Sequence, residues 1–294
     1  MKIVAAGCSG MLGTPWVDQM RAAGHEVVLL SRSGKGGVQW DGRTLGDWAK
    51  ELRTADAVIN LSGSTIQQRW NEAGRKSILD SRVESTRVIA QALREGPTTV
   101  RTWINASAVG YYGNDFVNLK DESSLPGTGF LADVSAAWER ELFAPDLPEI
   151  RRVALRTGVV LGREGGAFPV WKKLTKFFLG GQVADGKTPI PWIHEADWLG
   201  MANHVLTSES AEGPWNLVGP ESNTNAEVMA AMRKALHRPW SPPAPKFGIK
   251  LVEAVFGVPS ALSLEGARVV PKAANDAGYK FQFPTLQASI ADLC

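Results

Sequence analysis

Three glycines follow the first apolar segment of this chain in the pattern G-x-x-G-x-x-G. Residues Ile3 to Ala6 are typical of a buried parallel strand, and Met11 to Ala23 is an expected helix with one apolar face. Gly7, Gly10 and Gly13 lie between the two. Glycines at such a turn permit a tight bend, a close approach of backbone to a pyrophosphate, and close packing of the helix on the sheet. The pattern predicts a dinucleotide site, and no Gly-Lys-Ser/Thr follows that would indicate a P-loop.

The start of the predicted helix offers free N–H groups and a positive partial charge to a phosphate. We therefore expect the residues of the glycine turn to bind the cofactor: Gly7, Ser9, Gly10, Met11, Leu12 and Gly13. Cys8 is interpreted as a small filler, because bound phosphate would cover it. The only other cysteine is Cys294, which argues against a disulfide framework and favours a reducing compartment.

The end of the second strand, Glu26 to Leu30, indicates which dinucleotide is bound. NAD-binding proteins carry an acidic residue there that holds the ribose 2′-hydroxyl. In this chain the strand runs into Ser31, Arg32 and Ser33. A guanidinium with two hydroxyls suits a 2′-phosphate, which a carboxylate would repel. NADP(H) is therefore favoured over NAD(H); a surface arginine in a glycine-rich loop is the alternative interpretation.

Strand and helix patterns alternate along the first half of the chain. After Val38 to Trp40 and a helix around Thr44 to Leu52, the sequence predicts a strand at Ala57 to Leu61, a helix at Asn71 to Arg94 and a strand at Thr102 to Ala106. The predicted fold class is α/β. It is a doubly wound parallel sheet of the NAD(P)-binding Rossmann type, with a smaller, mostly helical C-terminal substrate lobe.

The second half of the chain leaves this pattern. Residues 1–165 are the predicted Rossmann domain, with a return segment at about 190–220, and residues 166–189 and 221–294 are the predicted substrate lobe. Residues 239–245 are rich in proline and form a predicted stiff connector. Three tryptophans in this half are either walls of a cleft between the lobes or simply core residues: Trp171, Trp192 and Trp198.

Binding crevices in such sheets lie at the carboxyl ends of the strands. One strand ends in four residues that we expect to contact cofactor ribose and phosphate, an ordinary turn being the alternative: Asn60, Leu61, Ser62 and Gly63. The next strand ends in Ser107, followed by Tyr111 and Tyr112. Ser107 is a candidate for orienting a substrate oxygen. Either tyrosine is a candidate for proton transfer if its phenol pKa is depressed, and loop packing is the alternative for both.

These segments resemble the extended short-chain dehydrogenase/reductases, within the NAD-dependent epimerase/dehydratase group. The resemblance rests on the glycine turn, on residues 60–63 and on the segments 105–113 and 156–162. A narrower resemblance is to the YfcH-type epimerase-family proteins, which have their own C-terminal domain. It covers nearly the whole chain and rests on residues 68–70, 81–83, 191–198, 242–245 and 267–272.

The chain departs from the superfamily at two places, the first of which is the catalytic motif. Those enzymes use Tyr-x-x-x-Lys on a helix, where the lysine lowers the tyrosine pKa and holds the cofactor ribose. When Glu139 is matched to the glutamate that follows this motif, the tyrosine and lysine positions fall on Leu131 and Ser135. At the second place, near Arg82, the superfamily's helix asparagine is replaced. With Ala106 and Ser107, Arg82 is expected from the resemblance to contact the cofactor.

Hydride transfer leaves an alkoxide-like oxygen that some acid must protonate. The candidates in place of the missing tyrosine are Tyr111, Tyr112, Asp133 and His194. In related extended enzymes the region of His194 faces the substrate, and imidazole titrates near neutral pH. Capping of the helix that runs toward Leu206 is the alternative interpretation for His194.

Charge and composition limit the partners. The net charge of +2 arises from interspersed acids and bases, which argues against a nucleic-acid or membrane surface. The four histidines lack ligand spacing, so no metal site is predicted. Because the first strand starts at residue 2, no secretory segment is expected, and the chain is interpreted as a soluble cytoplasmic monomer or homodimer. Its expected partner is an unidentified small-molecule substrate.

Two functions of different class remain open. In the first, the protein is an NADP(H)-dependent oxidoreductase or nucleotide-sugar-epimerase-like enzyme. In the second, it is an NADP(H)-binding sensor or regulatory protein without catalysis, an interpretation that Leu131 and Ser135 favour. The loop from Ser107 to Gly113 keeps polar groups at the active end of the sheet, which favours the enzyme.

Overall fold

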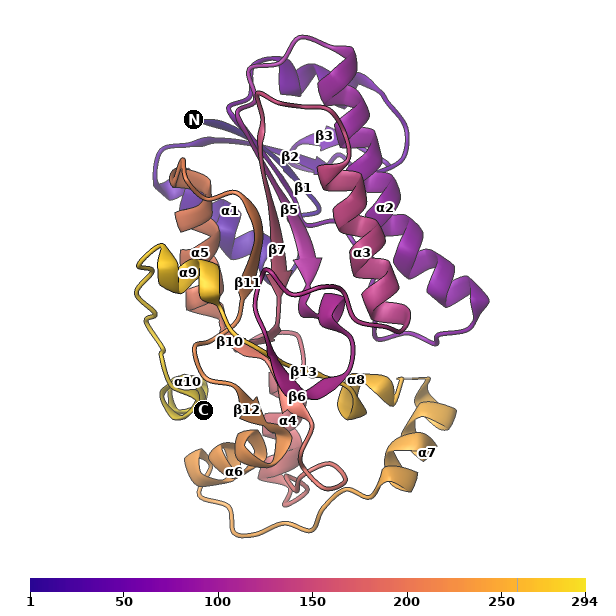
Figure 1. The fold of residues 1–294 in the computed structure, drawn as a ribbon, viewed down its shortest axis with the longest axis vertical. Coiled ribbons are helices and arrows are strands. Elements are labelled where there is room, and N and C mark those ends of the chain that lie inside the picture. The colour runs from indigo at the N-terminus through magenta and orange to yellow at the C-terminus, as the bar shows by residue number, and fades with distance from the viewer. Residues whose placement is uncertain (258) are drawn as a thin grey trace.

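A parallel seven-stranded sheet forms the centre of the protein in the computed structural model, which describes residues 1–257 and 259–294, with the backbone alone at 247, 251, 252, 255 and 256. The strand order is β11-β7-β5-β4-β1-β2-β3 (Figure 1). The strands are β1 (Lys2–Ala6), β2 (Glu26–Ser31), β3 (Val38–Gln39), β4 (Ala57–Asn60), β5 (Thr102–Ala108), β7 (Arg151–Thr157) and β11 (Gly213–Leu217). The order reverses direction between β1 and β4, so the doubly wound α/β fold is confirmed.

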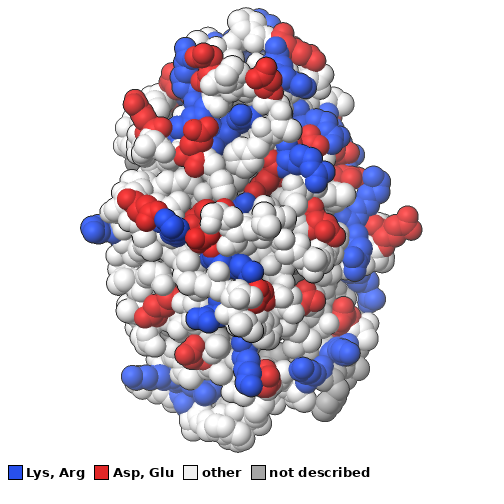
Figure 2. All heavy atoms as spheres, in the orientation of Figure 1, with Lys and Arg blue, Asp and Glu red and all other residues white. Residues whose placement is uncertain are grey.

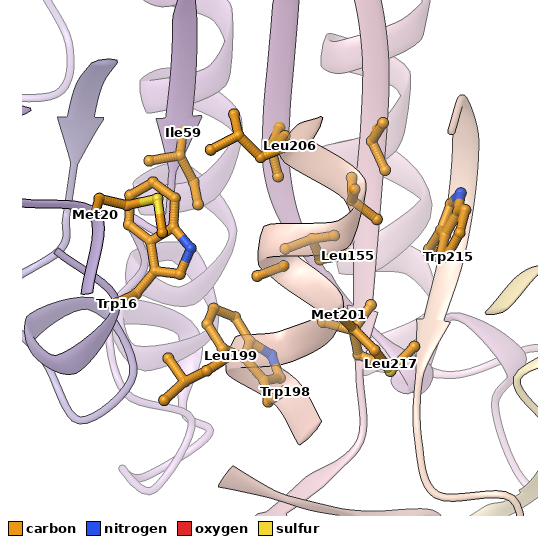
Figure 3. Close-up of a cluster of buried hydrophobic side chains, with 14 of the residues drawn as sticks. Trp16, Met20, Ile59, Leu155, Trp198, Leu199, Met201, Leu206, Trp215 and Leu217 are labelled. Carbon is orange, nitrogen blue, oxygen red and sulfur yellow. The ribbon is translucent and has the colours of Figure 1, made fainter. Parts of the chain in front are cut away.

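Helices cover both faces of this sheet. α1 (Gly13–Ala22) and α5 (Glu195–Thr207) pack on one face. Figure 3 shows Trp16 and Met20 of α1 and Trp198 and Met201 of α5 meeting side chains of the strands there. The elements on the other face are the 3-10 helix η1 (Asp47–Arg53), α2 (Glu72–Glu95) and α3 (Phe130–Phe143).

The central strands are buried on both sides, which explains their continuous apolar sequence. In β1, Ile3 and Ala5 face the cluster under α1 and α5, and Val4 and Ala6 face the cluster under α2, all four with no exposed surface. The alternation places the strands as a middle layer between two apolar cores. Side chains beyond the carboxyl ends of the strands are then free to form a site.

The remaining strands form three pairs below the large sheet in Figure 1. They are β8 (Val159–Leu161) with β10 (Trp192–His194), β9 (Pro189–Ile190) with β12 (Asn223–Thr224), and β6 (Asp115–Lys120) with β13 (Ala267–Val269). The helices of this region are α4 (Phe168–Lys176), α6 (Asn225–Ala235), α7 (Lys246–Phe256), α8 (Ala261–Leu264), α9 (Lys272–Asp276) and α10 (Leu286–Leu293). α4, α6 and α10 share an apolar core.

The predicted division into two domains stays a prediction, and the structure shows which contacts cross it. β11 joins the large sheet, as the expected return segment requires. Ala274 of α9, however, packs in the core under α1 and α5, and β6 pairs with β13 from the end of the chain. Trp192 and Trp198 are core residues, 0% and 1% exposed.

Two local features differ from the sequence-based expectation. The helix expected from Thr44 begins only at Asp47, because the Asp41 carboxylate accepts hydrogen bonds from the backbone of Arg43 and Thr44 and holds a turn there. The pair β6–β13 was not predicted, because most of the side chains of β6 are exposed and give no apolar alternation.

The viewed face of the protein carries Lys and Arg side chains interspersed with Asp and Glu (Figure 2). Within residues 1–257 and 259–294, no helix combines the length and apolar character needed to cross a membrane.

Candidate functional site

A cavity of about 660 Å³ lies where β1, β2 and β4 end. Seven of its lining residues are among the predicted cofactor contacts: Gly7, Ser9, Ser31, Arg32, Leu61, Ser62 and Gly63. The others were not predicted from the sequence: Leu30, Trp40, Asp41, Gly42, Arg43, Ser64, Ser77, Ser81, Glu84 and Ser85. The cavity lies at the switch point of the sheet, where such folds bind ligands.

The three glycines of the turn after β1 differ in what a side chain at each position would meet. Gly7 has a φ of 69°, and a Cβ there would lie 2.6 Å from Ser62. A Cβ on Gly13 would lie 2.4 Å from the Cα of Cys8, so only glycine lets α1 start this close to the turn. A Cβ on Gly10 would meet no atom within 4 Å. Gly10 therefore borders open space at the start of α1, which has no side-chain cap.

Four buried polar atoms on the cavity wall have no hydrogen-bond partner among the described residues. One is Oε2 of Glu84, which forms an ion pair with Arg43, and the other three have neither kind of partner. They are the Ser31 and Ser62 hydroxyls and the Trp40 Nε1. Buried polar groups are rarely left unpaired in folded proteins, because each one costs free energy. A ligand rich in hydroxyl and phosphate oxygens would satisfy them.

Arg32 is exposed at the end of β2, and no acidic side chain in the described residues forms an ion pair with it. Two acids share this end of the cavity, and both are engaged. Asp41 accepts hydrogen bonds from the Thr44 hydroxyl and from two backbone N–H groups, which hold the pKa of its carboxyl below the usual range. Glu84 lies 2.7 Å from Nε of Arg43. The free charge here is that of Arg32.

The cavity lining leaves out nine predicted cofactor contacts: Gly10, Met11, Leu12, Gly13, Ser33, Asn60, Arg82, Ala106 and Ser107. Asn60 is an example of a predicted contact that does not line the cavity. Its side chain is fully buried, donates to the Asn105 Oδ1 at 2.8 Å and accepts from the Ser62 backbone N–H at 3.1 Å. Asn60 thus shapes the turn after β4 and holds Ser62 in place.

Ser107 belongs to a buried polar network at the end of β5. Its hydroxyl donates to Glu139 at 2.6 Å, and Glu139 also accepts two 2.8 Å hydrogen bonds from Arg156. Arg156 donates in turn to the Tyr112 hydroxyl, which donates to Asn216 at 2.6 Å. Every side chain in this network has a hydrogen-bond partner, so the network fixes the loop after β5.

The two tyrosines differ in their surroundings. Tyr112 is 1% exposed, and burial raises the pKa of its phenol to about 12, which opposes a role in proton transfer. Tyr111 is partly exposed, and its ring lies 3.6 Å from Cζ of Arg156. The Tyr111 hydroxyl has no hydrogen bond to any described residue. Of the two phenols, Tyr111 is the one free to meet a ligand.

The positions matched to Tyr-x-x-x-Lys lie beside the same loop. A Cβ on Gly110 would lie 3.2 Å from the Cβ of Leu131 and 3.7 Å from the Ser135 hydroxyl. The Ser135 hydroxyl donates to the Leu131 carbonyl one turn back in α3. Asp133 lies on the exposed side of α3, and its side chain forms no hydrogen bond or ion pair with the described residues of this loop. The helix face beside Gly110 therefore presents an alkyl group and a small hydroxyl.

His194 is the N-cap residue of α5. Its Nδ1 accepts the Ala196 backbone N–H at 3.1 Å, so the neutral ring carries its proton on Nε2, 3.3 Å from Asp292. The ring also stacks on Phe283. Burial lowers the pKa of His194. None of these partners belongs to the cavity or to the Ser107 network, so the substrate-facing role of His194 stays a prediction that this geometry opposes.

Two further residue types concern the chemistry of the site. The Cys8 thiol is buried, and burial raises its pKa to about 12, which suits the predicted filler. In the part of the chain that the structure describes, no three His, Cys, Asp or Glu side chains are grouped to hold a metal ion.

Two family models match the chain. One, described as "NAD dependent epimerase/dehydratase family", matches residues 3–131, and the other, "Domain of unknown function (DUF1731)", matches residues 244–293. The sequence is 36% identical over 299 residues to the epimerase family protein SDR39U1 of Mus musculus, covering 100% of this chain and 99% of that protein.

Solved structures agree with these matches. The crystal structure of human epimerase family protein SDR39U1 (isoform2) with NADPH has a TM-score of 0.87 and 33% identity, covering 100% of this chain and 99% of that one. The nucleoside-diphosphate sugar epimerase from Corynebacterium glutamicum has a TM-score of 0.81 and 28% identity, over 99% of this chain and 57% of that one.

Proposed function

This chain belongs to the NAD dependent epimerase/dehydratase family, and we propose that it binds NADP(H) in the cavity at the ends of β1, β2 and β4. The diphosphate lies at the open start of α1 beside Gly10. The Ser31 and Ser62 hydroxyls, which lack partners among the described residues, bind cofactor oxygens. The bound cofactor supplies hydride chemistry at its nicotinamide ring.

The unpaired Arg32 at the end of β2 carries the choice of NADP(H) over NAD(H). An NAD site needs a free carboxylate for the ribose 2′-hydroxyl, and both nearby acids are engaged, Asp41 by Thr44 and Glu84 by Arg43. A guanidinium instead binds a 2′-phosphate. The NADPH in the human relative's crystal structure supports the same choice.

We further propose that the protein is an oxidoreductase or epimerase-like enzyme that acts without Tyr-x-x-x-Lys. Its substrate is a small molecule of unidentified structure. Tyr111 is the phenol at the end of β5 whose hydroxyl is free, so it is the proposed proton-transfer residue. The alternative, an NADP(H)-binding sensor, is favoured by Leu131 and Ser135, because neither side chain can replace a tyrosine and a lysine as acid and cation.

Calorimetric titration of the full chain with NADPH and with NADH tests the cofactor. We expect NADPH to bind at least tenfold more tightly, and no heat from either coenzyme at millimolar concentration would overturn the proposal. Absorbance at 340 nm is then followed with NADPH and a panel of carbonyl compounds. Turnover of any compound supports the enzyme, and tight NADPH binding with no turnover supports the sensor.

A further inference from the structure

The Arg82 guanidinium is held between a glycine and a tryptophan. Its Cζ, Nη2 and Nη1 lie 3.1, 3.3 and 3.4 Å from the position of a Cβ on Gly63, so the flat group faces that residue. The Trp138 ring centroid lies 5.1 Å from Cζ. Gly63 follows β4 and Trp138 lies on α3, so two separate elements fix the plane of the guanidinium.

Nη1 of the Arg82 guanidinium donates two hydrogen bonds, whereas the edge formed by Nε and Nη2 donates none to the described residues. Nη1 donates to the Ser64 carbonyl at 3.1 Å and to the Ile78 carbonyl at 3.0 Å. Among residues 1–257 and 259–294, no hydrogen-bond acceptor meets Nε or Nη2, and no carboxylate forms an ion pair with Arg82. An Nε–Nη2 edge is the fork through which arginine binds a carboxylate or phosphate in a bidentate manner.

No carboxylate among the described residues compensates the charge of Arg82. Burial lowers its pKa to about 10, so the group is still a cation at neutral pH. Arg82 is half-buried, and a partly desolvated cation without a counter-charge is costly, so proteins commonly pair such groups. The missing partner is one that a ligand can supply.

The guanidinium lies between Gly63, which lines the cavity, and Trp138 of α3, the helix that borders the loop after β5. Gly63 and Ser64, which contact the guanidinium, line the cavity. Trp138 lies one helical turn beyond Ser135, which faces Gly110. Arg82 thus stands at the junction of the cofactor cavity and the place where a substrate would meet it.

We propose that the Nε–Nη2 edge of Arg82 is an anion-binding point that takes a phosphate or carboxylate of a bound ligand. The inference rests on the proposed function for the identity of the cofactor. Two sources offer this chemistry: the diphosphate of NADPH, and a carboxylate or phosphate on a second small molecule bound beside it.

The test compares Arg82→Met with Arg82→Lys and with the control Arg75→Met. Arg75 lies on the same helix, 4.6 Å from the Phe130 ring centroid, and donates to the Trp70 carbonyl, but it is exposed and neither of these partners lines the cavity. NADPH affinity is measured by calorimetry. The thermal shifts caused by inorganic phosphate and by oxalate are measured with and without NADPH.

If the cofactor diphosphate is the anion, Arg82→Met weakens NADPH binding about tenfold or more, Arg82→Lys weakens it less, and Arg75→Met leaves it unchanged. If a second ligand supplies the anion, NADPH binding is kept and Arg82→Met loses the shift caused by phosphate or oxalate. Either result supports the inference.

Unchanged NADPH affinity together with unchanged phosphate and oxalate shifts in folded Arg82→Met would overturn it, even though wild-type NADPH binding stood. Failure of the wild type to bind NADPH would instead overturn the proposed function, and the phosphate and oxalate shifts would still decide the role of Arg82. If Arg82→Met does not fold, Arg82→Gln and Arg82→Lys replace it, with circular dichroism as the check of folding.

Discussion

The Ser107 hydroxyl donates a 2.6 Å hydrogen bond to the Glu139 carboxylate. The two side chains meet on the side of the sheet that α3 covers. Glu139 is held as well by Arg156, and all three side chains are less than 10% exposed. Because the proton of Ser107 is engaged by Glu139, its oxygen can offer a ligand only lone pairs. A ligand group that meets Ser107 must therefore be a donor.

This relationship predicts a graded loss of stability. Ser107→Ala removes one hydrogen bond and leaves the Glu139–Arg156 pair, so the free energy of unfolding should fall by about 1 kcal/mol. Glu139→Ala leaves Arg156 buried without its carboxylate and should cost about 3 kcal/mol or more. Urea unfolding measures both, and a larger loss for Ser107→Ala would contradict the network. Ser107→Ala should keep NADPH affinity within about twofold and, once a substrate is known, lower turnover.

The paired tyrosines allow a matched comparison. Tyr112 has partners in Arg156 and Asn216, so Tyr112→Phe should lower the free energy of unfolding by about 1–3 kcal/mol. Tyr111→Phe removes no such bond and should stay within about 0.5 kcal/mol. With a pKa of about 12, Tyr112 stays protonated below pH 10 and adds no step to a pH–rate profile there. Equal thermal denaturation of the two variants would refute this assignment.

His194 predicts how stability depends on pH. Burial outweighs the nearby Asp292, Glu195 and Asp197 and lowers the folded-state pKa below the unfolded value of about 6.5, so the unfolded chain binds the proton more readily. Stability is then full above about pH 6.5 and falls as the pH drops through that value toward the folded-state pKa. His194→Asn retains a capping oxygen and removes the titration. Its melting temperature should fall less than that of the wild type between pH 8 and pH 5.5; equal falls would show that His194 is not responsible.

Local patterns were enough to predict the strands and the turn of the cavity. Gly7 and Gly13 are required by contacts with Ser62 and Cys8, and the apolar run of β1 reflects burial on two sides. Such features depend on chain neighbours or on one sheet. For the same reason the ends of β2 and β4 identified Arg32 and Ser62 as cavity residues.

The rest of the cavity depends on long-range packing. Ser77, Ser81 and Ser85 line it because the N-terminal half of α2 lies beside the carboxyl ends of the strands, and no strand-end rule predicts a helix side chain. Their spacing of four residues places them on one helix face, and this serine stripe is the signal that the sequence analysis missed. Arg43 carries no comparable signal, because the turn held by Asp41 positions it.

Arg32→Asp should reverse the choice of cofactor. The substitution removes the free cation at the end of β2 and supplies a carboxylate, which repels a 2′-phosphate and accepts a ribose hydroxyl. NADPH affinity should fall by about a hundredfold, and NADH affinity should rise above it. Calorimetric titrations measure both. Arg53→Asp, on the exposed end of η1, is the control and should change neither. An unchanged NADPH affinity in Arg32→Asp would remove Arg32 from the site.

Gly10→Val should abolish cofactor binding without unfolding the protein. The Cβ direction at Gly10 is open for 4 Å, and its φ is not positive, so the valine fits the ligand-free fold. The same side chain then fills the space that a diphosphate needs at the start of α1, which predicts a loss of NADPH affinity of at least about a hundredfold. Gly96→Val is the matched control, because a Cβ there also has room, 3.8 Å from the Ala92 carbonyl, and lies at the far end of α2. Thermal denaturation checks that both variants fold. A Gly10→Val protein that melts like the wild type and still binds NADPH normally would show that the diphosphate does not lie against this turn.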